Sequence, residues 1–398
     1  MADQGLSSYS NIMGLPQPEP EALACSALLK HRIAEEIAAA GGWIAFDRYM
    51  ELALYTPGMG YYSGGAQKFG GAGDFVTAPE ISAAFGATLA AQAVQILAES
   101  APRMIEVGAG SGRLAADLLL ELERRDALPE HYGILDLSGE LRARQRDTLA
   151  QRAPQLLGRV EWLDRLPDHF DGLVLANEVL DAMPVHLVVW GEDRSISERG
   201  VGWQDEAFVW RDRPARGRVL ERAQSLAEEY ELAGGYLSEI CLAASDWTRA
   251  WAGIIGRGAL LLIDYGFPRH EYYHPQRDAG TLMCHYRHHA HGEPFYLPGL
   301  QDITAHVDFT TIVDAGYEAG FEFLGYSTQA NFLLSCGLDT VLARIPVEDS
   351  MRYLREAQAA QKLISPAEMG ELFKVVALGK GIAPALIGFA QSNRNASL

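Results

Sequence analysis

The sequence predicts an α/β protein in which a mostly parallel sheet carries helices on both faces. From about residue 102, short apolar segments alternate with longer amphipathic ones, beginning with Arg103–Val107 and Gly112–Arg125. This alternation is typical of a doubly wound sheet, because neighbouring parallel strands are joined by crossover helices. A turn with three glycines joins the first strand to its helix. The composition, 48% hydrophobic and 21% charged, is that of a globular enzyme with a large core.

The N-terminal part is expected to be a polar tail followed by a helical cap. Residues 1–24 read as a flexible tail, residues 22–42 have helical apolar spacing that ends in two glycines, and residues 45–55 read as a second short helix. The next segment, residues 56–82, is too rich in glycine for regular structure. Its interleaved aromatic and acidic residues favour a functional loop over a linker. We therefore assign residues 25–101 to a cap with a lid loop.

The remaining chain is expected to form the sheet core, interrupted once. After the first strand, further strands are expected at residues 132–137, 159–163, 170–180, 258–267, 321–327 and 372–381. Between Pro184 and about Gly258 the rhythm breaks: two antiparallel strands and a helix are expected there instead. The core therefore comprises residues 102–183 and 258–398, and residues 184–257 form an insertion after the fourth strand.

The charge limits the class of partner, and the cysteine content and hydropathy limit the kinds of site and the location. With 52 acidic and 33 basic residues, the formal charge of −19 disfavours nucleic acid and anionic membranes and favours a cationic partner. The four cysteines are scattered, without metal-binding or disulfide spacing. No apolar run is long enough for membrane insertion, and the first residues lack the pattern of a targeting peptide. We expect a cytoplasmic protein, and the sequence leaves a homodimer open.

The glycine turn indicates the cofactor. Gly108, Gly110 and Gly112 form G-x-G-x-G, and Arg113 stands where a dinucleotide fingerprint has its third glycine. A bulky arginine obstructs close packing around a pyrophosphate, and Glu106 would repel a phosphate. S-adenosyl-L-methionine fits better, because it is cationic and has no phosphate. Asp136, at the end of the second strand, is placed to accept hydrogen bonds from both ribose hydroxyls. An NAD-dependent oxidoreductase and a turn without a ligand remain alternatives.

Longer motifs make the chain similar to a known family. Nearly all of it, from about residue 44 to residue 381, resembles the MidA-like family of class I S-adenosyl-L-methionine-dependent methyltransferases. The resemblance is carried by "YMELALYTPGMGYYS", "GDFVTAPEISAAFG", "IEVGAGSGRLAADLL", "NEVLDAMPVH", "LLIDYGF", "GTLMCHYRHHAH", "QDITAHVDFT" and "GELFKVVALGKG". It implies a Rossmann-like, seven-stranded class I methyltransferase core. Mitochondrial members methylate an arginine on a subunit of respiratory complex I during its assembly, which implies a protein substrate. The family usually has a glutamate where this chain has Asp136.

The end of the fourth strand supplies the candidate catalytic residues. A protonated guanidinium is a poor nucleophile, and carboxylates that hold two of its nitrogens would leave the third aimed at the methyl group. We predict Glu178 as the main guanidinium ligand and Asp181 as its helper, on one face of a helical turn, with Asn177 lining the cofactor pocket. Asp181 as a turn cap before Pro184 is an equal alternative.

Two further segments carry candidate residues. The resemblance assigns cofactor contacts to Thr77 and Pro79 in "GDFVTAPEIS", the segment that also holds Asp74, and Thr77 or Ser82 is placed to cap the following helix. In "QDITAHVDFT", Asp302 or His306 could face the acceptor, whereas Asp308 is explained as a helix cap.

Six of the eleven histidines lie in residues 270–291, a segment that reads as a mobile loop. We expect no metal there, and substrate contact or a plain polar loop is favoured. An alternative without catalysis is an assembly chaperone that binds the cofactor and uses residues 184–257 and 267–298 as its partner surface.

Overall fold

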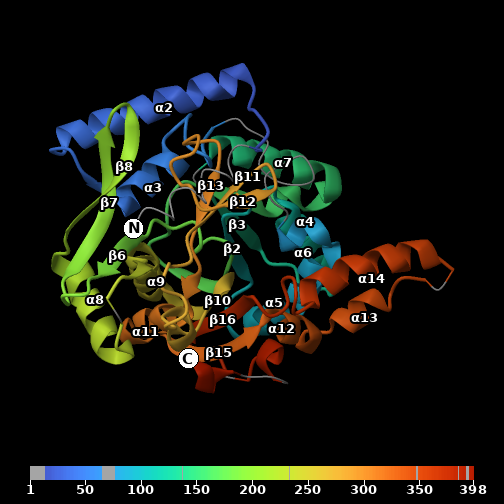
Figure 1. Cartoon of the computed structure of the whole chain (residues 1–398). Coiled ribbons are helices and arrows are strands. Elements are labelled where there is room, and N and C mark those ends of the chain that lie inside the picture. Colours follow the sequence, from blue (N-terminus) through green and yellow to red (C-terminus); the bar gives the residue numbers. More distant parts are fainter. Residues whose placement is uncertain are drawn as a thin grey trace. The chain divides into compact units, whose positions relative to one another are not determined.

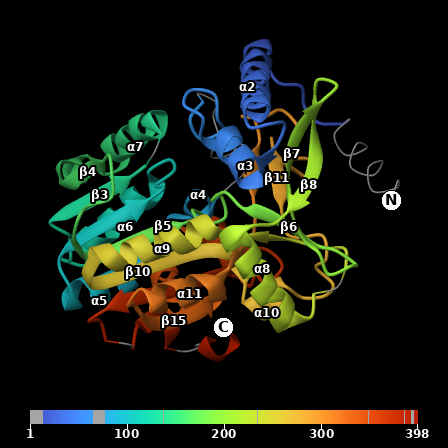
Figure 2. The same cartoon turned by 90° about the vertical axis from the view of Figure 1, so that its left-hand side faces the viewer.

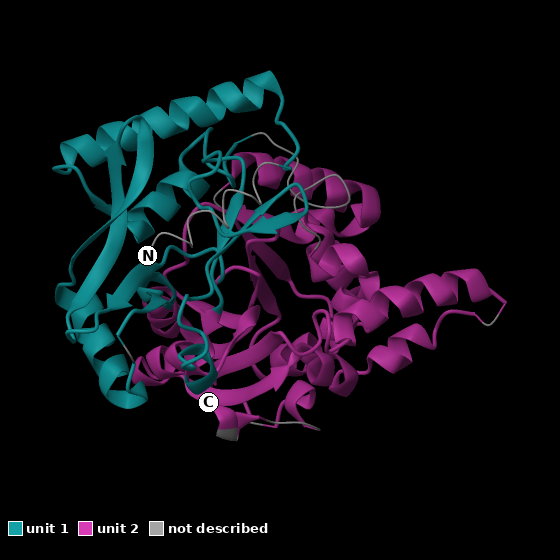
Figure 3. Ribbon diagram, in the orientation of Figure 1, with its two compact units in different colours: residues 1–75, 181–244, 270–306 teal, residues 76–180, 245–269, 307–398 magenta. Residues whose placement is uncertain are grey.

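The computed structural model describes residues 14–64, 77–136, 138–232, 234–346, 348–383, 385–390 and 394–398. The chain divides into two compact units, which Figure 3 shows in different colours. Unit 1 comprises residues 1–75, 181–244 and 270–306; unit 2 comprises residues 76–180, 245–269 and 307–398. Each unit is assembled from three separate stretches of the sequence.

Unit 2 is built on a mixed sheet (Figures 1 and 2). Its strands lie in the order β15 (Glu322–Thr328), β16 (Phe373–Lys380), β10 (Ile255–Phe267), β5 (Phe170–Asn177), β2 (Arg103–Val107), β3 (His131–Leu135) and β4 (Val160–Leu163). The five strands from β10 to β4 are parallel, whereas β16 is antiparallel to both of its neighbours. The short strand β14 (Val307–Asp308) pairs with β10 beside this path, so the sheet has eight strands.

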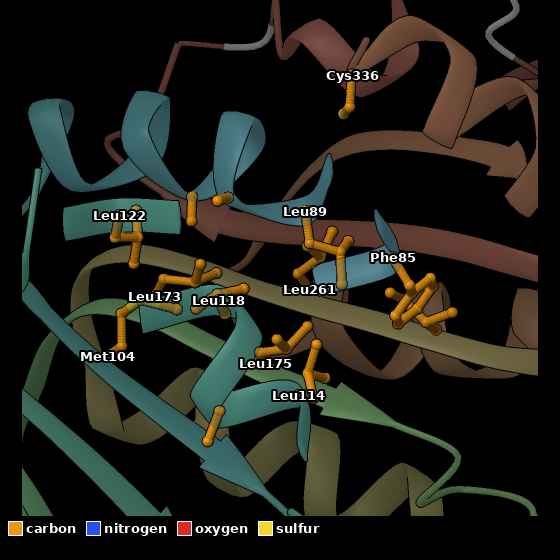
Figure 4. Packing of buried hydrophobic residues seen from close by; sticks show 14 of the residues in the cluster. Phe85, Leu89, Met104, Leu114, Leu118, Leu122, Leu173, Leu175, Leu261 and Cys336 are labelled. Atoms are coloured by element: carbon orange, nitrogen blue, oxygen red, sulfur yellow. The ribbon is translucent and has the colours of Figure 1, made fainter. Parts of the chain in front are cut away.

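Helices cover both faces of this sheet. Helices α5 (Ala83–Glu99) and α6 (Arg113–Arg124) pack on one face, where Phe85, Leu118 and Leu261 belong to the main apolar cluster (Figure 4). Helix α11 (Phe309–Glu318) packs on the other face, since a Cβ built on Gly316 would lie 2.7 Å from Leu378 Cδ1. The other helices of unit 2 are α4 (Ala78–Ile81), α7 (Gly139–Arg152), most of α9 (Leu242–Ile254), α12 (Gln329–Ser335), α13 (Leu338–Leu342), α14 (Ser350–Ile364) and the short 3-10 helices η1 (Pro154–Arg159), η2 (Ile387–Phe389) and η3 (Asn395–Ser397).

Unit 1 joins N-terminal helices to two antiparallel sheets. Its larger sheet has the strand order β1 (Ile44–Ala45), β7 (Ile196–Gln204), β6 (His186–Trp190) and β9 (Tyr236–Ile240), with β8 (Ala207–Pro214) paired to β7. Its smaller sheet has the order β12 (His289–His291), β11 (Met283–Tyr286) and β13 (Asp302–Thr304). The helices are α2 (Pro20–Ala39), α3 (Phe46–Tyr55), α8 (Gly217–Tyr230) and α10 (Arg269–Tyr272), the last of which begins in unit 2. A second apolar cluster, which includes Leu29, Tyr49 and Ile303, forms the core of unit 1.

The predicted α/β fold is confirmed. Its sheet is mixed, because β16 is antiparallel to both of its neighbours. The units differ from the predicted segments, because α5 packs in unit 2 rather than in a cap and residues 270–306 belong to unit 1. The insertion contains one strand more than expected before its helix, β7. Within the described part of the chain, no helix is long and apolar enough to span a membrane.

Candidate functional site

The glycine turn at the carboxyl end of β2 is the centre of the candidate site. Gly108, Gly110 and Gly112 have φ angles of 66°, 52° and 81°, in the left-handed region that side chains disfavour. A Cβ on Gly108 would lie 2.9 Å from Val179 Cγ2, and one on Gly112 would lie 2.9 Å from Gln145 Cα. The turn therefore requires glycine for both its conformation and its packing. It leads into the N-terminus of α6 and presents main chain at the strand ends, where sheets of this kind bind ligands.

Asp136 lies next to this turn, at the end of β3. The pairing of Val107 with Leu135 aligns the two strand ends, and the Gly108 N–H donates to the Leu135 carbonyl at 2.9 Å. The buried Asp136 carboxylate accepts hydrogen bonds from the Ser138 N–H at 2.9 Å and from Gln145 Nε2 at 2.8 Å. These two donors fix the orientation of the carboxylate.

Glu106 is enclosed within the sheet edge rather than exposed. Its side chain is 2% exposed, and Oε2 accepts a 2.6 Å hydrogen bond from the Tyr132 hydroxyl. Burial raises the pKa of Glu106 to about 7, although the bond from Tyr132 opposes this shift. The charge of Glu106 therefore changes near neutral pH.

The end of β5 carries Asn177 and Glu178 in a strained turn. Asn177 pairs with Ile263 of β10, and the Glu178 N–H donates to the Ile263 carbonyl at 2.9 Å. Glu178 has a φ of 53°, which costs a residue other than glycine about 1 kcal/mol or more. The expected helical turn from Glu178 to Asp181 is wrong: residues 178–181 form bends and the start of a turn, because the chain leaves the strand in a left-handed conformation.

Asp264, at the corresponding position of β10, holds this turn in place. Its carboxylate is buried, and Oδ2 accepts hydrogen bonds from the N–H groups of Val179 at 3.2 Å and Leu180 at 2.9 Å. Strain at Glu178 is thus opposed by two hydrogen bonds to a charged acceptor. Strained residues are frequent at functional sites.

Asn177 has an atom available for a ligand. Its Nδ2 donates to Glu178 Oε1 at 3.0 Å, which orients both side chains. Its Oδ1 is buried and accepts no hydrogen bond from the residues that the structure describes. A buried acceptor without a partner is costly, so a donor on a bound ligand would satisfy it.

The segment before α5 places Thr77 and Pro79 in the same unit as the glycine turn. Thr77 precedes α4, and its carbonyl accepts from the Glu80 N–H at 2.9 Å. The Thr77 side chain makes no capping bond, whereas Ser82 caps α5 through the Ala84 N–H at 3.1 Å, as one of the predicted alternatives required. Residues 65–76 of the predicted lid loop, which include Asp74, lie outside the described residues.

Asp181, Asp302 and His306 fall in unit 1, whereas Glu178, the main predicted guanidinium ligand, falls in unit 2. The Asp181 carbonyl accepts from the Ala305 N–H at 3.0 Å, between Asp302 and His306 in the sequence. Both oxygens of the buried Asp302 carboxylate lie 3.0 Å from the Tyr62 hydroxyl, which donates to them. The structure thus bonds the Asp181 main chain to the residue that directly follows β13, the strand that carries Asp302. Asp308 caps α11 through the Thr311 N–H, as predicted.

The histidine-rich segment is not the loop that the sequence suggested. His285 lies on β11 and His289 and His291 lie on β12, because an antiparallel hairpin forms around the turn at His288. His291 Nδ1 accepts from the Glu293 N–H at 3.3 Å, and burial lowers the pKa of His291. Among the described residues, the group with metal-ligand spacing lies elsewhere, at Asp47, His186 and Glu198, which already pair with one another.

Sequence reasoning missed three residues that shape the cofactor turn. Asp264 had a usable signal, because it directly follows the continuous apolar run 259–263 of β10, whose last residue, Ile263, pairs with Asn177. Gln145 had none, because it contacts the glycine turn from α7 and stands in no recognisable pattern. Glu80, on α4, belongs to the quoted segment "GDFVTAPEIS", but the motif alone predicts no role for it.

Comparison with known proteins gives a consistent result. A family model described as "Putative S-adenosyl-L-methionine-dependent methyltransferase" matches residues 87–327. A crystal structure of a Burkholderia thailandensis protein bound to S-adenosyl-homocysteine is 54% identical, covers 97% of this chain and 100% of its own, and superposes with a TM-score of 0.93. A second structure from that organism is 53% identical over the same shares, with a TM-score of 0.90.

More distant relatives carry more specific names. The mitochondrial protein arginine methyltransferase NDUFAF7 of Danio rerio is 27% identical over 87% of this chain and 85% of its own length. Its Drosophila melanogaster homologue is 28% identical over 93% of this chain and 90% of its own length.

Proposed function

The chain belongs to this family of S-adenosyl-L-methionine-dependent methyltransferases, and we propose that it transfers the methyl group to an arginine side chain of a protein. The distant relatives named as protein arginine methyltransferases support the acceptor. The net charge of −19 also favours a cationic acceptor over an anionic one. The observation that carries the proposal is the strained Glu178 turn beside the glycine turn.

S-adenosyl-L-methionine is the cofactor, as the sequence predicted, and an NAD-dependent oxidoreductase is set aside. When bound, it supplies an electrophilic methyl group on a sulfonium. We assign its recognition to the glycine turn (Gly108, Gly110 and Gly112), to Asp136 for the ribose hydroxyls, and to Thr77, Pro79, Glu106 and Asn177. The turn, whose conformation and packing favour glycine, and the buried Asn177 Oδ1 support this assignment.

In this proposal Glu178 binds the acceptor guanidinium. A carboxylate that accepts two parallel N–H bonds fixes the plane of a guanidinium and draws positive charge toward itself. The bond from Asn177 Nδ2 and the turn held by Asp264 limit the rotation of Glu178. Such positioning is the main contribution a protein makes to methyl transfer, because the reacting atoms must be aligned and close.

The role of Asp181 as a second acceptor ligand stays a prediction, since Asp181 belongs to unit 1 and Glu178 to unit 2. Its main chain is bonded to the segment that carries Asp302 and His306, so these three residues are candidates for one acceptor-binding surface within unit 1. By family resemblance, a subunit of respiratory complex I is the proposed protein substrate. The cytoplasmic location and the homodimer stay predictions.

The test uses Glu178→Gln with Glu161→Gln as its matched control, since Glu161 is exposed on β4 of the same unit. Purified protein is incubated with the cofactor and arginine-containing or lysine-containing peptides, and methylation is measured by mass spectrometry. We expect transfer to arginine that falls at least about a hundredfold in Glu178→Gln and is unchanged in Glu161→Gln. S-adenosylhomocysteine affinity, measured by calorimetry, should stay within about threefold.

Other outcomes separate the alternatives. Transfer to lysine alone would refute the arginine proposal while leaving the family assignment intact. Cofactor binding without transfer to any protein in a cell extract would favour the assembly chaperone. Equal activity in Glu178→Gln and in the unchanged protein would remove Glu178 from the site.

A further inference from the structure

Helix α4 is tied to the cofactor turn by one side chain, Glu80. Its Oε1 accepts a short hydrogen bond from the Ser111 hydroxyl, within the glycine turn. Its Oε2 lies 3.3 Å from Arg113 Nη1, and its main-chain carbonyl accepts from the same nitrogen at 3.1 Å. Ser111 and Arg113 flank Gly112, so Glu80 contacts the turn on both sides of its last glycine.

Arg113 occupies a position where a positive charge is unfavourable. It is the first residue of α6, where the helix dipole and the unpaired N–H groups already create positive potential. A cation there attracts an anion, as phosphate-binding turns do, and repels a cation. The cofactor of this family carries a positive sulfonium, so an uncompensated Arg113 would oppose it.

Asp117, the other carboxylate near Arg113, already has a partner. Its Oδ2 is 3.9 Å from Arg113 Nε, but its Oδ1 accepts a 2.6 Å hydrogen bond from Arg152. Burial raises the pKa of Asp117, which weakens it further as a counter-charge. Glu80 is closer to Arg113, and its side chain is only 15% exposed, which limits screening by solvent.

We propose that Glu80 is a specificity-determining residue that neutralises Arg113 and so allows the glycine turn to accept a cationic cofactor. This inference rests on the proposed cofactor function. It explains why an arginine is tolerated where a dinucleotide fingerprint has its third glycine: the side chain of Arg113 is held by Glu80 on α4. It also gives the short α4 a role in cofactor selection.

The test compares S-adenosyl-L-methionine with S-adenosylhomocysteine, which differ by the methyl group and by the positive charge on sulfur. Dissociation constants of both are measured by calorimetry on the full chain, for the unchanged protein and for Glu80→Gln. Glutamine keeps an acceptor for Ser111 but removes the charge. We expect Glu80→Gln to weaken S-adenosyl-L-methionine roughly three- to tenfold more than S-adenosylhomocysteine. The double variant Glu80→Gln/Arg113→Gln should return the ratio of the two constants to its original value.

A matched control and a second variant make the result decisive. Glu36→Gln removes the charge of another glutamate paired with an arginine, Arg48 at 2.6 Å in unit 1, and should leave the ratio unchanged. Arg113→Gln alone should shift the ratio toward S-adenosyl-L-methionine, and it carries the test if Glu80→Gln does not fold. Equal weakening of both ligands in Glu80→Gln, or an unchanged ratio in Arg113→Gln, would overturn the inference. If the protein without substitutions binds neither ligand, the proposed function itself is refuted.

Discussion

Gln145 donates a 2.8 Å hydrogen bond to Asp136 Oδ2, and the same nitrogen lies 3.2 Å from the Gly110 carbonyl. One amide on α7 therefore connects the end of β3 to the glycine turn. Its Oε1 accepts from Trp162 Nε1 at 3.0 Å, so the whole side chain is fixed. The orientation of Asp136 toward a ribose depends on this residue, although it contacts no predicted catalytic group.

Replacing Gln145 by leucine is expected to weaken S-adenosylhomocysteine binding by about tenfold, because Asp136 and Gly110 lose a donor that a buried apolar side chain cannot replace. Calorimetric titration measures this. Gln151→Leu, at an exposed position on the same helix, is the control and should bind normally. Normal affinity in Gln145→Leu would mean that Asp136 keeps its orientation without the amide.

Ligand affinity should depend on pH through Glu106. Because burial raises its pKa from 4.5 to about 7, the folded protein holds this proton more tightly than the unfolded chain. The resulting stability is fully present below about pH 4.5 and is lost as the pH rises through about 7. An ammonium group on the ligand prefers the ionised form. S-adenosylhomocysteine should therefore bind more tightly at about pH 8 than at about pH 6.

Two variants test this assignment. Glu106→Gln should abolish the pH dependence. Tyr132→Phe removes the hydrogen bond that lowers the pKa of Glu106, so the midpoint should move to higher pH. A pH dependence that persists in Glu106→Gln would show that another group titrates.

Gly112→Ala should destabilise the protein by about 1–3 kcal/mol, since a φ of 81° and a contact of 2.9 Å with Gln145 Cα both oppose a Cβ. Denaturant unfolding measures the change. Gly139→Ala is the control. Gly139 is the first residue of α7, and a Cβ added there has no atom within 4 Å. This variant should be neutral or more stable by up to about 1 kcal/mol. A similar loss in both variants would contradict the assigned strain.

Glu239 is expected to be a main determinant of stability in unit 1. Its buried carboxylate accepts hydrogen bonds from the Thr281 N–H at 2.8 Å, the Leu282 N–H at 3.0 Å and the Tyr272 hydroxyl at 3.1 Å. Glu239→Leu leaves these donors without a partner and should cost about 2–4 kcal/mol by thermal or denaturant unfolding. Glu239→Gln should cost less. Glu228→Ala, on the exposed face of α8, should stay within about 0.5 kcal/mol.

The sheet core was predictable from the sequence because its signals are local. Continuous apolar runs such as 258–263 mark strands buried on both faces, and the amphipathic run that begins at Arg113 marks α6. Strand β7, "ISERGVGWQ", lacked such a signal. Its two glycines and alternating polar residues resemble a loop, and only pairing with β1, β6 and β8 makes it a strand.

The site was predictable only in part, for a similar reason. The three glycines, Asp136 and Asn177 could be predicted as site residues because each stands at the end of a predicted strand or in the turn that follows it. The left-handed conformation of Glu178 could not be predicted, because it depends on Asp264, more than eighty residues later in the chain. The histidine hairpin also escaped prediction, since β11 is stabilised by pairing with β13 as well as with β12.

The position of β16 has a consequence for synthesis on the ribosome. This strand, residues 373–380, lies between β10 and β15 and is hydrogen-bonded to both, although it follows them in the sequence. Until it emerges, β10 and β15 each expose an unpaired apolar edge, which favours association between nascent chains. The part of the sheet from β2 to β5 can form earlier. The core therefore closes only after residue 380 has been released.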